Sequence, residues 1–516
     1  MGGVVAAGHG KTAAAAVEML KQGGNAFDAA VAGVLASCVA ESVLTSLAGG
    51  GFLLAHTGAG EHVLFDFFTQ TPADKTLEHP LDFYPICADF GDTVQEFHIG
   101  LGAMAVPGVL KGLVHVHQRL GRLPLEKVVA PAIYLARRGV VVNGFLAYVY
   151  GVLKPILLAT PGARAMYAPQ GQLLKAGEML HMPAFADALE RLVNQGIDAF
   201  WQDMAAQVTD STGGYLTVED FERYQVIERQ PLCLDYHGTQ LLTNPPPSAG
   251  GGLVACSLAL LADCALAGYG SPEHLRSLSQ VMRFTNVARR DGYDTRLHQS
   301  CVAEEFLSAG HLDQYRGQLA DAIASLQSPK VANKLGSTTH LSVIDHEGNA
   351  ASVTTSNGEG SSYVLPGTGI MVNNMLGEED LNPHGFHQWT PDQRMSSMMA
   401  PTMVLRDGHP YLVLGSGGSN RIRTAILQVI SNLVDFQMPL EAAVAAPRIH
   451  WENDVFHLEP GFNQALLTPI IGDAQPLWWQ AQNMFFGGVH AVGLDENGVL
   501  HGAGDSRRSG AVAVAQ

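Results

Sequence analysis

The stretch Gly336-Ser-Thr-Thr-His-Leu-Ser-Val-Ile-Asp-His-Glu-Gly-Asn-Ala350 lies where the pattern of the chain changes. Up to Ser337, residues 326–337 contain Ser, Pro, Asn, Lys and Gly, which is typical of a surface linker. From Thr339 on, apolar and polar residues alternate, and residues 345–349 carry a turn sequence. The pattern predicts a hairpin of strands 339–344 and 350–356, whose first strand begins directly behind the linker.

Outside this hairpin, the sequence predicts runs of helices and runs of strands, and not a regular alternation of the two. This order favours an α+β layered sandwich over repeated βαβ units. Asn25 is a predicted N-cap for a second, wholly buried helix. Helices are predicted within 11–22, 25–40, 107–211, 253–299, 420–436 and 440–446. Hairpins are predicted within 52–67, 225–243, 339–356 and 402–414, and across 495–498.

The composition is that of a large folded protein with an acidic surface. Of 516 residues, 47% are hydrophobic and only 15% are charged. The 30 Lys and Arg against 48 Asp and Glu give a net charge of −18, which repels phosphate backbones and anionic bilayers. The two richest apolar stretches are interrupted by Glu41 and by Lys154. We therefore expect neither nucleic acid nor a membrane as a partner.

The remaining features indicate no metal or organic cofactor. The histidines of 384–387 have no third ligand at a clear spacing. No basic segment followed by an apolar one is visible at the start, so a cytoplasmic location is expected, although a chain trimmed of a leader, periplasmic or secreted, would look the same. The cysteines lie apart without a CxxC pair and are expected to be mostly buried and reduced. They are Cys38, Cys87, Cys233, Cys256, Cys264 and Cys301.

Five stretches of the chain resemble the γ-glutamyltranspeptidase family of N-terminal-nucleophile hydrolases. The resemblance implies a four-layer αββα sandwich, built jointly by residues 1–337 and 338–516 after self-cleavage between Ser337 and Thr338. It also implies a heterodimer of these two products, with higher oligomers left open. In the family's order, the stretches are 23–31, the junction at 336–340, 366–374, 396–402 and 415–419.

Thr338 would carry the chemistry that this resemblance implies. Its hydroxyl attacks the preceding carbonyl, an N-to-O acyl shift gives an ester, and hydrolysis frees Thr338 as a new N-terminus. A threonine hydroxyl is a poor nucleophile alone, but a freed α-amine with a reference pKa of about 7.7 to 8.0 can act as its base. The implied activity is hydrolysis or transfer of small γ-glutamyl amides such as glutathione. The alternatives are an acylase for a glutaryl or hydrophobic acyl group, and an unprocessed, inactive homologue that acts as a binding protein.

Three further residues are assigned to catalysis by the same resemblance. Ser356 takes the position of a threonine that hydrogen-bonds the nucleophile. Gly417 and Gly418 resemble the oxyanion loop, where backbone N–H groups stabilise the charge that develops on the carbonyl oxygen. Because the usual proline before the two glycines is absent, an assignment shifted by one residue stays open, as does a plain strand-to-helix turn.

Substrate binding is assigned to five residues of the same segment. Glu378, or Glu379 as the alternate, would bind the α-ammonium group of the substrate, and Asn374 precedes them. Ser396 and Ser397 would bind the α-carboxylate. The alternative for the two glutamates is an exposed acidic loop. The alternative for the serine pair is that it only caps local backbone.

One departure from the family pattern concerns substrate recognition. Family members have an arginine, followed by a glutamate, where this chain has Phe68 and Thr69, and that arginine pairs with the α-carboxylate of the γ-glutamyl group. Loss of a guanidinium removes hydrogen bonds worth about 1.5 to 3 kcal/mol each. Arg394 is the nearest basic residue to the serine pair and could replace it.

Overall fold

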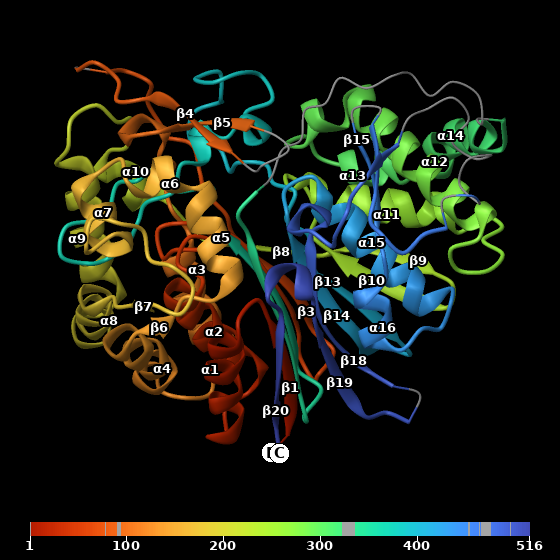
Figure 1. Cartoon of the computed structure of the whole chain (residues 1–516), viewed down its shortest axis with the longest axis horizontal. Coiled ribbons are helices and arrows are strands. Elements are labelled where there is room, and N and C mark those ends of the chain that lie inside the picture. The colour runs from red at the N-terminus through yellow and green to blue at the C-terminus, as the bar shows by residue number, and fades with distance from the viewer. Residues whose placement is uncertain are drawn as a thin grey trace.

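The chain folds into four layers, with two β-sheets packed face to face between two layers of helices (Figure 1). Helices α1–α10, red to yellow, cover one sheet, and α11–α16, green to blue, cover the other. The predicted αββα sandwich of the α+β class is therefore confirmed. The computed structural model describes residues 2–77, 79–89, 94–321, 336–452, 455–463, 465, 476–495 and 497–516.

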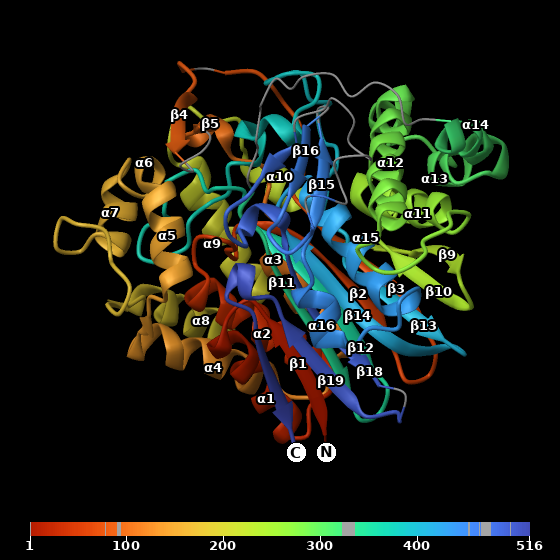
Figure 2. The same cartoon turned by 45° about the vertical axis from the view of Figure 1, so that its right-hand side comes forward.

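A seven-stranded antiparallel sheet holds the predicted junction. Its strand order is β20-β1-β11-β12-β2-β3-β8, and interior strand β11 begins at Thr339, directly after Thr338. The first and last strands of the chain pair with each other, so the two termini lie side by side (Figure 2). The strands are β1 (Gly3–Ala7), β2 (Gly50–His56), β3 (His62–Phe67), β8 (Ile227–Arg229), β11 (Thr339–Asp345), β12 (Ala350–Ser356) and β20 (Ala511–Ala515).

The second sheet has six strands in the order β19-β18-β14-β13-β10-β9. Strands β14 and β18 contact β11 across the interface between the sheets. Its strands are β9 (Leu232–Tyr236), β10 (Thr239–Thr243), β13 (Thr402–Arg406), β14 (His409–Gly417), β18 (Gly488–Leu494) and β19 (Leu500–Gly504). Shorter strands outside these sheets are β4 (Tyr84–Asp89), β5 (Val94–Ile99), β6 (Val140–Val141), β7 (Met179–Leu180), β15 (Ile449–Glu452), β16 (Val455–Leu458) and β17 (Leu477–Trp478).

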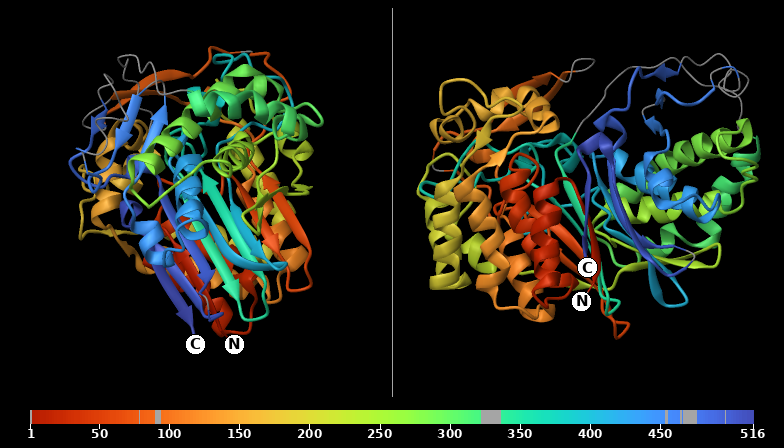
Figure 3. Two further views of the ribbon diagram at one scale, coloured as in Figure 1. Left: turned by 90° about the vertical axis from the view of Figure 1, so that its right-hand side faces the viewer. Right: turned by 60° about the horizontal axis from the view of Figure 1, so that its bottom comes forward.

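The two helical layers lie on the outer faces of the sheets, as the view from below shows (Figure 3). The first layer contains α1 (Gly10–Lys21), α2 (Ala26–Ala40), α3 (Val109–Leu120), α4 (Leu125–Arg138), α5 (Gly144–Val152), α6 (Lys154–Leu157), α7 (Pro161–Tyr167), α8 (Pro183–Gln195), α9 (Ile197–Thr209) and α10 (Val218–Arg223). The second contains α11 (Ala249–Leu261), α12 (Pro272–Ala288), α13 (Val302–Phe306), α14 (Ala309–Asp321), α15 (Arg421–Val434) and α16 (Leu440–Ala445).

Alternation along the strands explains why the seven-stranded sheet is covered on both faces. In β2, Leu53 and Ala55 belong to the core beneath α1–α9, whereas Phe52 and Leu54 belong to the core shared with the second sheet. Successive side chains of a strand point to opposite faces. Both faces of β2 are apolar, so both must be buried.

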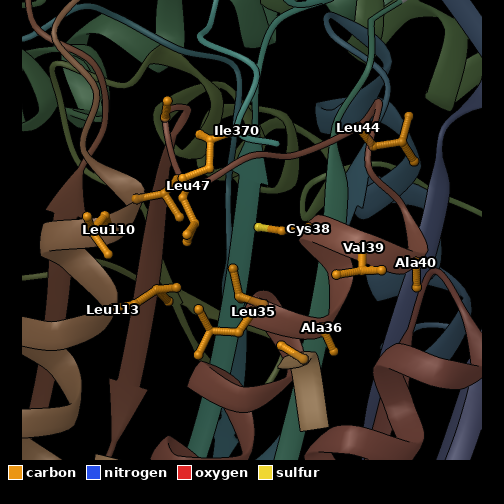
Figure 4. Close-up of a cluster of buried hydrophobic side chains, with 14 of the residues drawn as sticks. Leu35, Ala36, Cys38, Val39, Ala40, Leu44, Leu47, Leu110, Leu113 and Ile370 are labelled. Atoms are coloured by element: carbon orange, nitrogen blue, oxygen red, sulfur yellow. The ribbon is translucent and has the colours of Figure 1, made fainter. Parts of the chain in front are cut away.

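Helix α2 forms the centre of the first core. The Asn25 side chain accepts from the N–H of Asp28, and the Asp28 carboxylate accepts from the N–H of Asn25, which confirms the N-cap as a full capping box. Every residue of the helix is buried. Figure 4 shows its apolar side chains, Cys38 included, beside Leu110 and Leu113 of α3.

The expectation that most cysteines are buried is wrong. All six are free thiols, but Cys87, Cys233 and Cys301 are exposed, and only Cys38 and Cys256 are fully buried. Cys87 and Cys233 lie on the small β4–β5 hairpin and on edge strand β9, where one face of the strand meets solvent. A strand position therefore did not guarantee burial for these two residues.

Some expectations stay predictions. Of the proposed linker 326–337, only Gly336 and Ser337 belong to the described residues, and Ser337 is buried. Within the described ranges, no helix is long and apolar enough to cross a membrane. The same part of the chain contains no group of three or more His, Cys, Asp or Glu residues placed to hold a metal ion. The cytoplasmic location is untested.

Candidate active site

A pocket lies beside the predicted junction, between the ends of the two sheets. Residues on both sides of the junction line it, together with the segments that follow β12 and β14. Its lining includes both apolar side chains and hydroxyl and carboxyl groups. The apolar residues are Phe68, Met375, Leu381, Met398, Met399 and Ile422, and the polar ones are Ser337, Thr338, Ser356, Glu359, Glu378, Asp380, Ser397 and Ser419.

Ser356 contacts the bond that the sequence predicts to be cleaved. Strands β11 and β12 pair with Thr339 opposite Thr355, so Ser356 is brought next to Thr338. The Ser356 hydroxyl donates to the carbonyl oxygen of Ser337 at 2.5 Å. A donor at this oxygen polarises the carbonyl and would stabilise the charge formed when a nucleophile attacks it.

The Gly417–Gly418 turn packs directly against the junction. A Cβ atom on Gly417 would lie 2.2 Å from the Thr338 carbonyl oxygen, so no side chain fits there. Gly418 has a φ of +123°, a conformation that favours glycine. The close approach brings the backbone of this turn to the site, and its role as the oxyanion loop stays a prediction.

Glu359 was missed by the sequence analysis. Its Oε1 accepts from the N–H of Ser337 at 3.0 Å, and its other oxygen accepts from the Ser337 hydroxyl. Burial raises the pKa of the Glu359 carboxyl to about 7. The available signal was a carboxylate between Gly358 and Gly360, just after a strand whose last residue had already been assigned to the site.

Asn374 and Glu378 support the loop that carries Glu359. The Asn374 side-chain oxygen accepts from the N–H groups of Glu359 at 2.8 Å and of Gly360 at 3.0 Å. Glu378 lines the pocket, and burial together with the nearby Glu359 carboxylate raises its pKa well above the usual value. Glu379 is exposed and is not among the lining residues. The structure thus brings Glu378, and not its alternate, into the pocket.

The serine pair is divided between two environments. Ser397 is buried and lines the pocket, and its hydroxyl accepts from the N–H of Met399 at 3.0 Å. Ser396 is half-buried and is not among the lining residues. Only Ser397 is therefore positioned for contact with a bound molecule in this pocket.

His340 holds the two sheets together beside the site. Its ring nitrogens hydrogen-bond Thr354 at 2.8 Å and Ser342 at 2.9 Å, and Ser342 in turn donates to the carbonyl of His490 in the second sheet. Burial lowers the pKa of His340 well below its usual value, so the ring is neutral. A neutral histidine whose two ring nitrogens are both hydrogen-bonded is a structural residue.

Comparison with known proteins identifies the family. A model described as gamma-glutamyltranspeptidase matches residues 12–515. The chain belongs to the γ-glutamyltranspeptidase family. It is 31% identical to the acylase ACY 1 proenzyme of Pseudomonas sp. (strain V22), covering 98% of this chain and 92% of that protein. It is also 31% identical to the glutathione hydrolase proenzyme of Escherichia coli (strain K12), covering 98% and 90%.

A solved structure of the same architecture is that of a cephalosporin acylase from Bacillus halodurans. It superposes with a TM-score of 0.84 and 26% sequence identity, over 99% of this chain and 95% of the acylase. The relatives are named both as glutathione hydrolases and as acylases, and those from Pseudomonas sp. and Escherichia coli are named as proenzymes. Membership of this γ-glutamyltranspeptidase family of N-terminal-nucleophile hydrolases makes the chain an enzyme of the acyl-transfer class.

The departure from the γ-glutamyltranspeptidase pattern at Phe68 places an aromatic side chain in the lining of the pocket. Phe68 is 1% exposed and stacks on Phe52 with ring centroids 5.4 Å apart. Arg394 lies behind it, where its guanidinium donates to the Phe68 carbonyl and to the Tyr224 hydroxyl and lies 3.6 Å from Asp66. Arg394 is therefore engaged in holding the Phe68 segment and does not line the pocket.

Arg508 is a second residue that the sequence analysis missed. It is 2% exposed, and burial lowers the pKa of its guanidinium to about 10. Its Nη1 donates to the Thr338 carbonyl at 3.3 Å and its Nη2 to the Gly336 carbonyl at 3.2 Å. No local pattern could have found it, because 172 residues separate it from Gly336.

Proposed function

We propose that this chain is a self-processing acyltransferase or hydrolase that cleaves γ-glutamyl amides, such as glutathione, through an acyl-enzyme on Thr338. The observation that carries the proposal is the contact of the Ser356 hydroxyl with the Ser337 carbonyl, beside Thr338 and the glycine turn. It places a donor on the oxygen that would become an oxyanion. The names of the relatives support both the processing and the acyl transfer.

Self-cleavage would proceed in two steps. The Oγ1 atom of Thr338 attacks the carbonyl carbon of Ser337, the C–N bond between the two residues breaks, and the hydroxyl proton passes to the new amine. Water then hydrolyses the Ser337 ester. The freed α-amine can take the hydroxyl proton of Thr338 when an amide substrate is attacked, so one residue serves as nucleophile and base.

The two products would remain one folded unit. In the seven-stranded sheet, β20, β11 and β12 come from residues 338–516, whereas β1, β2, β3 and β8 come from 1–337. Strand β1 lies between β20 and β11, so strands of the two products interleave. Neither product can complete this sheet alone, which supports a tightly bound heterodimer.

Intact mass and a chromogenic donor test the proposal. Purified protein should separate under denaturing conditions into residues 1–337 and 338–516, and should release p-nitroaniline from its γ-glutamyl derivative. A single chain of full mass that hydrolyses the donor would contradict the mechanism. A single chain without activity would instead support the inactive homologue.

A second candidate, an acylase for a hydrophobic acyl group, is favoured by the lining of the pocket. Phe68, Met375, Met398 and Met399 contribute apolar side chains to the lining, and the residues found to line the pocket include no lysine or arginine. Such a lining suits an acyl chain without a carboxylate. The candidates are separated by kcat/KM for γ-glutamyl and hexanoyl anilides, because only the acylase should prefer the hexanoyl donor.

Replacement of Glu378 by alanine is expected to impair recognition of an amino group. Glu378→Ala should raise KM for the γ-glutamyl anilide about 10- to 100-fold, and KM for the glutaryl anilide, which lacks the amino group, much less, since a hydrogen bond to a charged group contributes about 1.5 to 3 kcal/mol. Glu379→Ala, at an exposed neighbour, is the matched control. Equal changes for both donors would remove Glu378 from amino-group recognition.

A further inference from the structure

The peptide group between Gly336 and Ser337 is held at both ends by side chains. Its carbonyl oxygen accepts from Arg508 Nη2 at 3.2 Å, and its N–H donates to Glu359 Oε1 at 3.0 Å. Glu359 also binds the Ser337 hydroxyl. One acidic and one basic residue, which we call the Glu359–Arg508 clamp, therefore fix the residue whose carbonyl Thr338 would attack.

Both members of the clamp are buried ionisable groups. Glu359 is 3% exposed and Arg508 2%. The guanidinium of Arg508 donates to three carbonyl oxygens, those of Gly336, Thr338 and Met484, and its Nε has no partner. Within the described part of the chain it forms no ion pair within 4.0 Å. A buried charge without a polar partner destabilises the protein, so loss of any of these contacts would leave an unsatisfied buried group.

Self-cleavage would remove some of these hydrogen-bond partners. The same Thr338 hydroxyl attacks Ser337 during processing and the substrate during catalysis, so the carbonyl of the substrate must take the place of the Ser337 carbonyl. Residues 336 and 337 must then withdraw. Glu359 loses both of its Ser337 donors and Arg508 loses the Gly336 carbonyl, and the two groups face the space that becomes free beside Thr338.

We propose that the vacated Glu359–Arg508 clamp binds the α-amino acid head group of the acyl donor. Glu359 accepts from the amino group and Arg508 donates to the carboxylate, in place of the arginine that is absent at Phe68. An ammonium group has three donors, so Glu378 can bind it together with Glu359. The opposite charges of the clamp match a zwitterion better than a neutral acyl chain. This inference rests on the proposed self-cleavage and γ-glutamyl transfer.

Three anilides test the clamp in the wild-type processed enzyme. The γ-glutamyl donor carries both groups, the glutaryl donor lacks the amino group, and the 4-aminobutyryl donor lacks the carboxylate. We expect kcat/KM to fall about 10- to 100-fold when either group is removed. Equal values for the γ-glutamyl and 4-aminobutyryl donors would overturn the role of Arg508. Equal values for the γ-glutamyl and glutaryl donors would overturn that of Glu359.

Two variants separate recognition from a structural role. Arg508→Met should lower the preference for γ-glutamyl over 4-aminobutyryl donor about 10- to 100-fold, with little change in the preference over glutaryl donor. Glu359→Gln should lower the preference for γ-glutamyl over glutaryl donor about 10- to 100-fold, with little change in the preference over 4-aminobutyryl donor. A structural role would lower activity toward all three donors in proportion and leave both ratios at wild-type values, which would overturn the proposal. Arg406→Met and Glu441→Gln, outside the pocket, control for the loss of a charge.

Processing is followed by intact mass in every preparation, and kinetics are measured on the cleaved fraction. If a variant is not cleaved and its kinetics cannot be measured, the proposal is judged from the kcat/KM ratios of the three donors in the wild-type enzyme. A wild-type protein that is not cleaved refutes the proposed function itself. A cleaved, active wild-type enzyme that fails to discriminate among the three donors refutes only the clamp.

Discussion

Thr338→Ala is expected to remain a single chain of 516 residues and to lose amidase activity by at least about 10³-fold. The variant lacks the hydroxyl that forms both the processing ester and the acyl-enzyme, and without cleavage no terminal amine appears to act as base. The measurements are intact mass after prolonged incubation and release of p-nitroaniline from the γ-glutamyl donor.

Two controls show whether the effect belongs to this hydroxyl. Thr338→Ser keeps a hydroxyl at the same place and should still be cleaved before residue 338. Thr339→Ala removes the neighbouring hydroxyl, which donates to Glu41 and so is engaged away from the junction, and it should also be cleaved there. Cleavage of Thr338→Ala at the wild-type position would refute the assignment of the nucleophile.

Ser356→Ala is expected to slow self-cleavage about 10²- to 10³-fold, which is the usual cost of removing one donor to a developing oxyanion. The Ser356 hydroxyl contacts the Ser337 carbonyl at 2.5 Å and also accepts from the N–H of Gly358, so it is held in position. The rate is measured from the fraction of uncleaved chain against time after purification. Ser356→Thr, which keeps the hydroxyl, should restore most of the rate.

Ser352→Ala is the matched control for a lost buried hydroxyl. Ser352 lies on the same strand and donates to the Leu414 carbonyl of the second sheet, away from the junction. It should be cleaved at the wild-type rate, with a free energy of unfolding lower than that of the wild type by about 1 kcal/mol. A wild-type half-life for Ser356→Ala would show that the contact with the Ser337 carbonyl does not assist cleavage.

Local signals in the sequence were sufficient for most of the elements that surround the site. The turn at 345–349 and the alternation on either side of it predicted β11 and β12, and Asn25 predicted the start of α2. Thr338 was singled out by the resemblance of residues 336–340 to the family's junction, since a threonine pair at the start of a strand is not by itself a sign of catalysis. Strands β1 and β20 were not predicted, because each is a five-residue run that becomes a strand only by pairing with distant segments.

The sequence by itself determined the layered fold and the family, because hydrophobic period and turn residues are local properties and five stretches follow the family's order. It also predicted the junction between Ser337 and Thr338. Only the tertiary structure decided which charged groups meet at that junction. Glu359 and Arg508 hold one peptide group although Arg508 lies near the other end of residues 338–516, and Arg394, close to the serine pair in sequence, is held behind Phe68. The reason is physical: a buried charge takes the position where its hydrogen bonds are satisfied, and the partners that satisfy it are set by sheet pairing and packing, not by sequence distance.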